Sequence, residues 1–369
     1  MQRGSLKEYL TEPFLKTLYD EVRKAGAIRS ISLDLTHECN IHCKGCYYFS
    51  QQINRLGSNA TDGDFDRLIE SEKERGTNFV TVVGGEPSLE LGRLKKVYDN
   101  FKMNVSTNGF RKIPYEGFEQ MPIGVSVWGN HATDRKMRGS GKRDIFPVAL
   151  KNYRNDSRAF WYYTVTPGNA HEIQQVTEEC VRNGNRVLYT FYSDLTNMGG
   201  SYDHRQGFQF AREEIARMIE RFPEHILLSN YIGEVVSTGK LFEQEWGYSV
   251  CTSISTNNPV NAERLTNGNP YSPHFRAYNA DFLTTRRCCT ATTRSCDSCL
   301  DVWQHFSWII LNMKKHLTTE ADFTNWLTTM YLFYFINRLV DWEKGAALLP
   351  EIHRRIGMER FTAEARKAS

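Results

Sequence analysis

The sequence contains no apolar run long enough to cross a lipid bilayer. The longest such run, at residues 330–340, is interrupted by Asn337 and Arg338, and it is shorter than the roughly 20 residues that a membrane helix needs. The first eight residues also lack the apolar core of a secretory signal peptide. We therefore expect a cytoplasmic protein with no membrane partner.

A strong excess of one charge sign is absent as well. The 369 residues include 46 Lys and Arg and 43 Asp and Glu, which leaves a net charge of +3 at pH 7. So small an excess gives no reason to expect a nucleic acid partner. With 40 % apolar and 24 % charged residues, the composition is that of a globular protein and excludes a collagen, a coiled coil or a fully disordered chain.

Nine cysteines are present, in two groups and one isolated residue. Structural disulfides are rare in the cytoplasm, so metal binding, redox chemistry or inert buried thiols must explain these residues. The isolated Cys180 falls in a predicted helix at 170–183, and we interpret it as a packing residue because free cysteine is usually buried. The first group is Cys39, Cys43 and Cys46, and the second is Cys251, Cys288, Cys289, Cys296 and Cys299.

Between residues 28 and 230, short β-branched or aromatic runs alternate with helical stretches. The pattern predicts strands at 31–35, 79–83, 103–106, 123–128, 160–165 and 186–192. It predicts helices at 61–74, 89–100, 145–153, 170–183 and 210–222, the first with Thr61 as N-cap and Asp64 in the capping-box position. Strands joined by helical crossovers form a parallel α/β sheet, which right-handed crossovers would curl into an open or closed barrel. Reactive groups in such folds gather beyond the carboxyl ends of the strands.

The last third of the chain has a different pattern. Residues 251–300 are rich in Thr, Ser, Asn and Cys with little periodicity, as expected of a small domain organised by a metal site. From 302 to 340 apolar residues return at helical spacing, with an interruption near 318–322, which predicts two closing helices. We therefore predict four parts: an N-terminal helical segment at 1–27, a barrel at 28–230, a Cys-rich domain at 231–301 and C-terminal helices at 302–369.

The loop after the first predicted strand has the spacing C-x3-C-x2-C, formed by Cys39, Cys43 and Cys46. Three thiolates on one short loop can hold three corners of a four-iron cluster and leave the fourth iron open to another ligand. The alternative is a structural zinc site, with His42 as a possible fourth ligand.

These cysteines, with further motifs in the same order over about 28–230, resemble the radical S-adenosylmethionine (SAM) superfamily. That family places its cysteine loop after the first strand of a partial (β/α)6 barrel, and Gly84-Gly85-Glu86-Pro87 is similar to its second-strand motif. The resemblance implies that this turn binds the methionine amino group of SAM. It assigns further SAM contacts to Tyr47, Ser106, Asn108, Ser126, Asn169 and Arg138, the last of these on the SAM carboxylate.

The resemblance also implies a reaction. SAM would chelate the open iron, and one electron from the reduced cluster would break a carbon–sulfur bond to give methionine and a 5′-deoxyadenosyl radical. The radical would abstract hydrogen from a peptide or from a small natural-product or nucleoside substrate. An electron donor such as flavodoxin or ferredoxin would be a partner, and the protein would orient SAM without a catalytic acid or base. Aromatic residues at 47–49, 128 and 191–192 could line the substrate cavity or belong to a packed core.

The second cysteine group is similar to the Twitch or SPASM extensions of radical SAM enzymes. By this resemblance an auxiliary iron–sulfur cluster would be held by Cys251, Cys289, Cys296 and Cys299, with Cys288 as a substitute for Cys289. A zinc site and unligated thiols remain alternatives, because C-x2-C spacing does not distinguish iron from zinc.

Two rival functions stay open. Arg287-Cys288-Cys289 resembles the Arg-Cys-Cys motif of arsinothricin-type enzymes, which transfer the 3-amino-3-carboxypropyl part of SAM. A non-catalytic zinc or iron–sulfur binding protein is the rival from another class, and it leaves the Gly-Gly-Glu-Pro turn at 84–87 unexplained.

Overall fold

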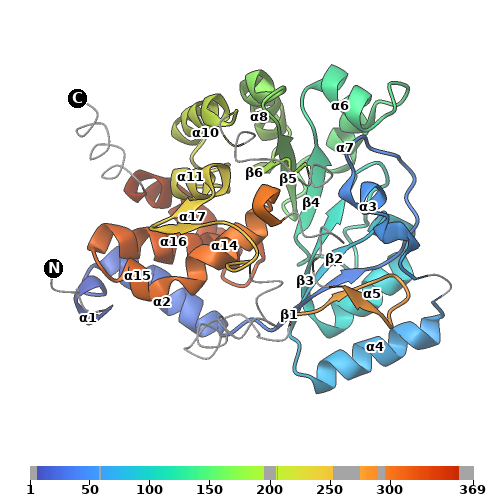
Figure 1. Ribbon diagram of the computed structural model, residues 1–369, viewed down its shortest axis with the longest axis horizontal. Helices are drawn as coiled ribbons and strands as arrows, with labels where there is room; N and C mark the ends of the chain where they lie inside the picture. Colours follow the sequence, from blue (N-terminus) through green and yellow to red (C-terminus); the bar gives the residue numbers. More distant parts are fainter. Residues whose placement is uncertain are drawn as a thin grey trace.

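The computed structural model describes residues 6–57, 60–194, 205, 207–251, 275–286, 288 and 296–356. At its centre, eight strands form one sheet in the order β10-β9-β1-β2-β3-β4-β5-β6 (Figure 1). The strands from β1 to β6 are parallel, and all six were predicted from the sequence. Their bounds are β1 (Ser30–Asp34), β2 (Phe79–Val83), β3 (Lys102–Thr107), β4 (Ile123–Val127), β5 (Ala159–Val165) and β6 (Arg186–Phe191).

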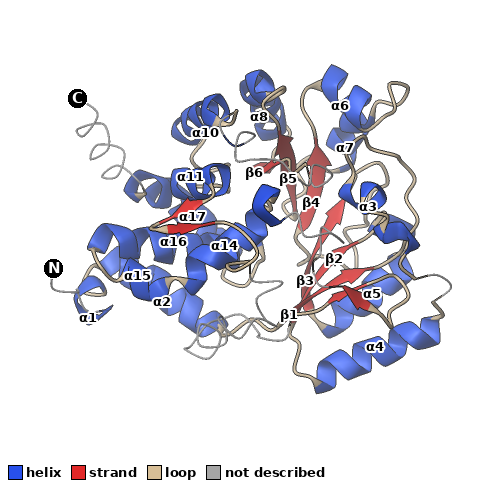
Figure 2. Cartoon of the chain, viewed as in Figure 1, coloured by secondary structure: helices blue, strands red, loops and turns tan. Residues whose placement is uncertain are grey.

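Helices connect these strands and pack around the sheet (Figure 2), which confirms the α/β fold class. The predicted helices are α4 (Asp62–Glu74), α5 (Leu91–Asn100), α7 (Ile145–Asn152), α8 (Ile173–Arg182) and α10 (Gln209–Arg221). The capping box of α4 forms as predicted, because Thr61 N donates to Asp64 Oδ2 (2.9 Å) and Asp64 N donates to Thr61 Oγ1 (3.1 Å). Cys180 on α8 is fully buried in the core, as predicted.

The sheet is an open barrel in the part of the chain that the structure describes. Its edge strands β10 and β6 are not paired with each other. On the β1 side the sheet is extended by β9 (Ala277–Tyr278), which pairs in parallel with β1, and by β10 (Thr285–Arg286), which is antiparallel to β9. The sequence did not predict these strands, because two residues are too few to show an alternating pattern.

The helices that were also missed include α6 (His131–Met137) and α11 (Asn230–Thr238). In α6 Asp134 is the buried residue, so the helix has no apolar stripe from which it could be recognised. It is started instead by Asn130, whose side chain accepts hydrogen bonds from Ala132 N and Thr133 N. Helix α11 begins at the predicted boundary between the barrel and the Cys-rich domain.

The C-terminal helices lie together on one side of the sheet (Figure 1). The two predicted closing helices are confirmed as α14 (Val302–Leu311) and α16 (Glu320–Ile336), and α15 (Met313–His316) lies between them. From Phe323 onward α16 is buried on every face, and the N-terminal helix α2 (Pro13–Ala25) packs against it. A further helix, α17 (Trp342–Arg355), follows.

Within the described residues, none of the helices combines the length and the apolarity that a bilayer span requires.

Candidate active site

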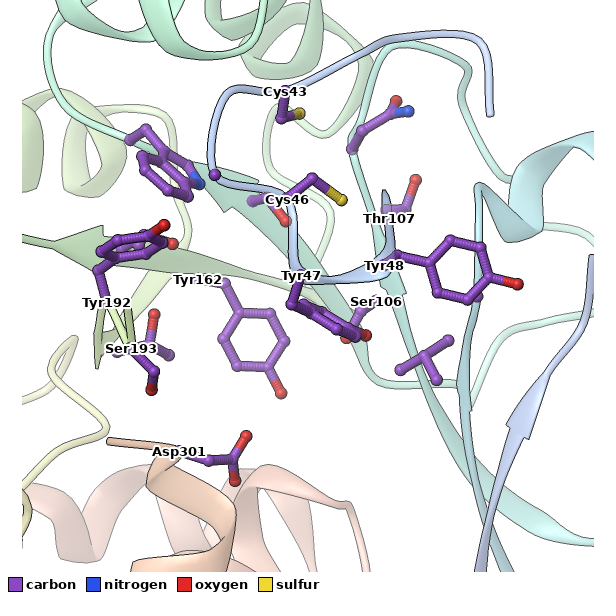
Figure 3. A pocket seen from close by; sticks show the side chains of 18 of the residues that line it. Cys43, Cys46, Tyr47, Tyr48, Ser106, Thr107, Tyr162, Tyr192, Ser193 and Asp301 are labelled. Atoms are coloured by element: carbon purple, nitrogen blue, oxygen red, sulfur yellow. The ribbon is translucent and has the colours of Figure 1, made fainter. Parts of the chain in front are cut away.

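A cavity of about 370 Å³ lies at the carboxyl ends of the parallel strands. Figure 3 shows Cys43 and Cys46 on one side of it and Asp301, which precedes α14, on the opposite side. Most of the predicted cluster and SAM residues line it: Cys39, Cys43, Cys46, Tyr47, Gly84, Gly85, Glu86, Ser106, Asn108, Ser126 and Arg138. The fold therefore brings together motifs that are up to a hundred residues apart in the sequence.

The three cysteines of the first group lie between β1 and the short helix α3 (Tyr47–Ser50). Burial raises the pKa of the Cys39 thiol to about 11 and that of Cys43 to about 12, and it also raises the pKa of Cys46. The charge of Cys46 further raises the pKa of both other thiols, which places the three sulfurs near one another. Three neighbouring, half-buried thiols on the wall of a cavity fit a soft-metal cluster with one open corner.

No group of three or more His, Cys, Asp or Glu side chains in the described ranges is arranged to hold a metal ion as it stands.

The glycine turn after β2 is pressed against the cysteine loop. Gly85 N donates to Thr36 O (2.8 Å) and Glu86 N donates to Glu38 O (2.8 Å), so the turn is bonded to the residues just before Cys39. A Cβ atom on Gly85 would lie 1.9 Å from Glu38 O, and Gly84 has a φ of +114°. Gly85 is required because there is no space for a Cβ atom, and Gly84 is required because of its backbone conformation.

Replacing Gly85 by Ala should therefore lower the free energy of unfolding by about 2–4 kcal/mol, since the cysteine loop or the β2 end must shift. Chemical denaturation followed by circular dichroism measures this change. Gly92→Ala is the matched control, because Gly92 lies in α5 with nothing within 4 Å of the added Cβ. Equal unfolding midpoints in the two variants would show that the close contact is absent.

Glu86 fastens the end of β2 to the end of β3. Its carboxylate is almost fully buried and accepts hydrogen bonds from Ser88 N (2.9 Å), Thr107 Oγ1 (2.6 Å) and Asn108 N (2.7 Å). Asn108 in turn donates through Nδ2 to Asn40 Oδ1 (2.7 Å) and to Cys39 Sγ (3.8 Å). A chain of contacts thus runs from β2 through β3 to the first cysteine.

Two predicted SAM residues do not line the cavity. Pro87 is buried at the start of the short helix η2 (Pro87–Leu89). The Asn169 side chain donates to Trp128 O (3.0 Å) and Thr164 O (3.0 Å), and so joins the ends of β4 and β5. Their roles toward SAM stay predictions.

The aromatic residues expected near the strand ends do line the cavity: Tyr47, Tyr48, Phe49, Trp128, Phe191 and Tyr192. The rings of Trp128 and Tyr192 meet edge to face, with centroids 5.1 Å apart. The Tyr192 hydroxyl approaches Gly45, where an added Cβ would lie 2.6 Å from it. An aromatic wall therefore rests directly on the cysteine loop.

Sequence reasoning missed a second wall, formed by Tyr162 on β5 and by Asp301, Trp303 and Gln304 at the start of α14. Trp303 Nε1 donates to the Tyr162 hydroxyl (2.7 Å). Gly124 on β4 makes room for the tyrosine ring, because a Cβ there would lie 1.9 Å from Tyr162 Cε2.

The sequence did contain one signal for this wall. Asp301 stands directly before the apolar run of the closing helix, and its side chain accepts from Gln304 N (2.9 Å) as an N-cap. Burial raises the pKa of the Asp301 carboxyl to about 6. Nothing in the sequence indicated that this cap would face the cavity.

The second cysteine group lies next to this wall. Burial raises the pKa of Cys299, and the nearby charges of Asp301, Cys288 and Cys251 raise it further. Asp301 N donates to Cys299 Sγ (3.5 Å), and Cys251 Sγ donates to Gln304 Oε1 (3.9 Å).

Cys296 is connected to the same region through its backbone. Its carbonyl accepts from Cys299 N (3.1 Å) and from Trp246 Nε1 (2.9 Å). The structure thus brings Cys251 and Cys288 near Cys299, and Cys296 is three residues before Cys299 in the sequence. Cys289, which the sequence analysis preferred as a ligand, lies outside the described residues. Arg287, which the aminocarboxypropyl rival requires, lies outside them too.

One protein-family model matches the part of the chain that contains this site. Residues 28–119 match a family described as "4Fe-4S single cluster domain", and the matched range contains β1, β2, β3 and the three cysteines at 39–46. This match supports the [4Fe-4S] cluster that the cysteine spacing predicted. No curated protein matches the chain.

Among solved structures, the chain is similar to SuiB of Streptococcus suis bound to its precursor peptide SuiA, with 14 % identity over 78 % of this chain and 68 % of that chain and a TM-score of 0.47. It is also similar to anSMEcpe with bound AdoMet and Cp18Cys peptide, with 14 % identity, 86 % and 99 % coverage and a TM-score of 0.49. TYW1 with a lysine-pyruvate adduct matches at 14 % identity, 57 % and 81 % coverage and a TM-score of 0.36.

Proposed function

We propose that this protein is a radical SAM enzyme that reductively cleaves SAM at a [4Fe-4S] cluster held by Cys39, Cys43 and Cys46. The observation that carries the proposal is the convergence of these cysteines with the Gly84–Gly85 turn, Asn108 and Ser126 around one cavity. A structural zinc site or an electron-transfer cluster has no need of an open cavity at its metal ligands, whereas a cluster with an open iron does.

The cluster would supply the electron that breaks a carbon–sulfur bond of SAM. The chain's own residues bind and orient: the glycine turn lines the cavity, and Ser106, Asn108 and Ser126 add polar side chains at the ends of β3 and β4. Glu86 links the ends of β2 and β3 through its three hydrogen bonds. The aromatic walls would exclude water from the reacting centre.

The second cysteine group supports an auxiliary iron–sulfur cluster. We assign Cys251, Cys288, Cys296 and Cys299 as its ligands, with Cys288 taken in place of Cys289 because Cys288 lies beside Cys299. An auxiliary cluster there would lie just behind Asp301 and Gln304, which face the cavity. It would therefore be within reach of a substrate in that cavity.

The substrate is a peptide or a small natural-product or nucleoside compound, and it would occupy the space between the cysteine loop and α14. The cavity of about 370 Å³ is within the usual range of small-molecule sites, roughly 300–1,000 Å³. Its wall on the α14 side offers Asp301 and Gln304 as polar contacts, and Tyr162 and Trp303 as apolar surface.

Analysis of the SAM cleavage products tests the proposal. Anaerobic incubation with SAM and dithionite should yield 5′-deoxyadenosine and methionine, whereas aminocarboxypropyl transfer would yield methylthioadenosine. Cys43→Ala should give neither product, while Cys180→Ala, a change in the barrel core away from the cysteine loop, should keep the parent's product. Full turnover in Cys43→Ala would refute the assignment.

A further inference from the structure

The loop that carries the first three cysteines has an outer face as well as the face toward the cavity. Cys43 and Cys46 line the cavity. His42 and Lys44, the neighbours of Cys43 in the sequence, are exposed to solvent and are not among the described residues that line the cavity. A reductant outside the protein comes closest to the cluster ligands at this outer face. Electron transfer slows steeply with distance, so an electron would enter most readily here.

The end of α6 and the segment after it are bonded to this outer face. Lys44 N donates to Met137 O (2.7 Å), and Met137 is the last residue of α6. Arg143 Nη1 donates to Asn40 O (3.0 Å). In Figure 1, α6 lies on the side of the sheet away from α14 and α16. The two hydrogen bonds therefore hold the exposed residues at 136–143 beside the cysteine loop and apart from the C-terminal helices.

This surface is basic. Four exposed cations form what we call the basic patch: Lys44, Lys136, Lys142 and Arg143. Within the described residues none of the four is in an ion pair, whereas the nearby Arg135 pairs with Asp144 (3.0 Å) and the two charges cancel. The net charge of the whole chain is +3, so its small positive excess is concentrated at this one place.

We propose that the basic patch is the docking surface for an acidic protein that delivers one low-potential electron to the cluster. The inference rests on the proposed function, because Cys39, Cys43 and Cys46 must hold that cluster. In each transfer the donor is oxidised by one electron and the cluster is reduced by one. Opposite charges speed up the encounter and orient the partner without a large interface, so that the donor can leave after each electron. A nucleic acid would also be attracted to the patch, but a place beside the cluster ligands favours a redox partner.

The test reverses two charges of the patch in the variant Lys136→Glu/Lys142→Glu, which keeps the bond from Arg143 to Asn40. Formation of 5′-deoxyadenosine from SAM is measured with saturating dithionite and, separately, with limiting reduced flavodoxin as the acidic donor. The dithionite rate should stay within about twofold of the parent's, because a small reductant needs no docking surface. The flavodoxin rate should fall about tenfold and depend less on salt.

The matched control is Lys7→Glu/Lys24→Glu, which makes the same change in net charge on α1 (Leu6–Tyr9) and α2, beside the C-terminal helices (Figure 1). Both of its rates should equal those of the parent. The Kd of oxidised flavodoxin is a second readout, which does not depend on turnover. It should rise about tenfold at low salt in K136E/K142E and stay unchanged in the control.

Equal flavodoxin rates and equal Kd values in the parent and K136E/K142E would overturn the inference. Loss of tRNA binding in K136E/K142E, with the flavodoxin rate unchanged, would overturn it too and assign the patch to nucleic acid. If the parent forms no product from SAM with dithionite, the proposed function is refuted instead. The flavodoxin Kd then still tests the docking surface by itself.

Discussion

A variant with Cys39, Cys43 and Cys46 all replaced by Ala should lose about four irons and four sulfides per chain, the content of one [4Fe-4S] cluster. The reason is that burial raises the pKa values of these half-buried thiols, so they are protonated without metal. Cluster binding deprotonates them, so their removal leaves no ligand for it. Anaerobic reconstitution followed by iron and sulfide assays measures the loss.

The iron content of the parent protein decides whether the second cysteine group holds a cluster. About eight irons in the parent and four in the triple variant would place an auxiliary cluster on the second cysteine group. In that case the Cys251→Ala/Cys296→Ala/Cys299→Ala variant should also retain about four irons. About four irons in the parent and none in the Cys39/Cys43/Cys46 variant would mean that the barrel cluster is the protein's single cluster, and would refute the auxiliary cluster. Cys180→Ala is the control for thiol loss and should keep the parent's content.

Replacing Arg286 by Met should lower the free energy of unfolding by about 3–5 kcal/mol, because it leaves the Asp34 carboxylate buried without its cation. Arg286 donates through Nη1 and Nη2 to the two Asp34 oxygens (2.7 and 2.8 Å), and the side chains are 6 % and 1 % exposed. Burial raises the pKa of Asp34 even against this pairing. The pair connects β10 to the end of β1, just before the cysteine loop.

Urea denaturation of Arg286→Met, Asp34→Asn and the double variant measures this contribution as a double-mutant cycle. The double variant should recover part of the loss, since neither charge is then left unpaired. Asp20→Asn is the control: it breaks the exposed Lys16–Asp20 pair and should cost less than about 1 kcal/mol. A cost that small for Arg286→Met would show that the β9–β10 hairpin does not dock on β1.

Much of the barrel could be predicted because its signals are local. The strand at 79–83 is a continuous run of apolar and β-branched residues, and Thr61 and Asp64 form a capping box from residues three positions apart. The cluster ligands were readable for the same reason, since a loop of eight residues sets the spacing of Cys39, Cys43 and Cys46 by itself. Hydrogen bonding over one turn and side-chain alternation along one strand do not depend on the rest of the fold.

The sequence by itself therefore determined the parallel α/β fold, the cysteine loop and the order of the motifs around it. The tertiary structure alone decided which side chains are already engaged: Arg138 with Ser126 and Asn108, and Tyr162 with Trp303, 141 residues away. It also decided that β9 extends the sheet beside β1 and that Cys288 lies near Cys299. These contacts join segments far apart in the chain, and their partners are selected by packing and desolvation in the folded state, which leave no periodic trace in the sequence.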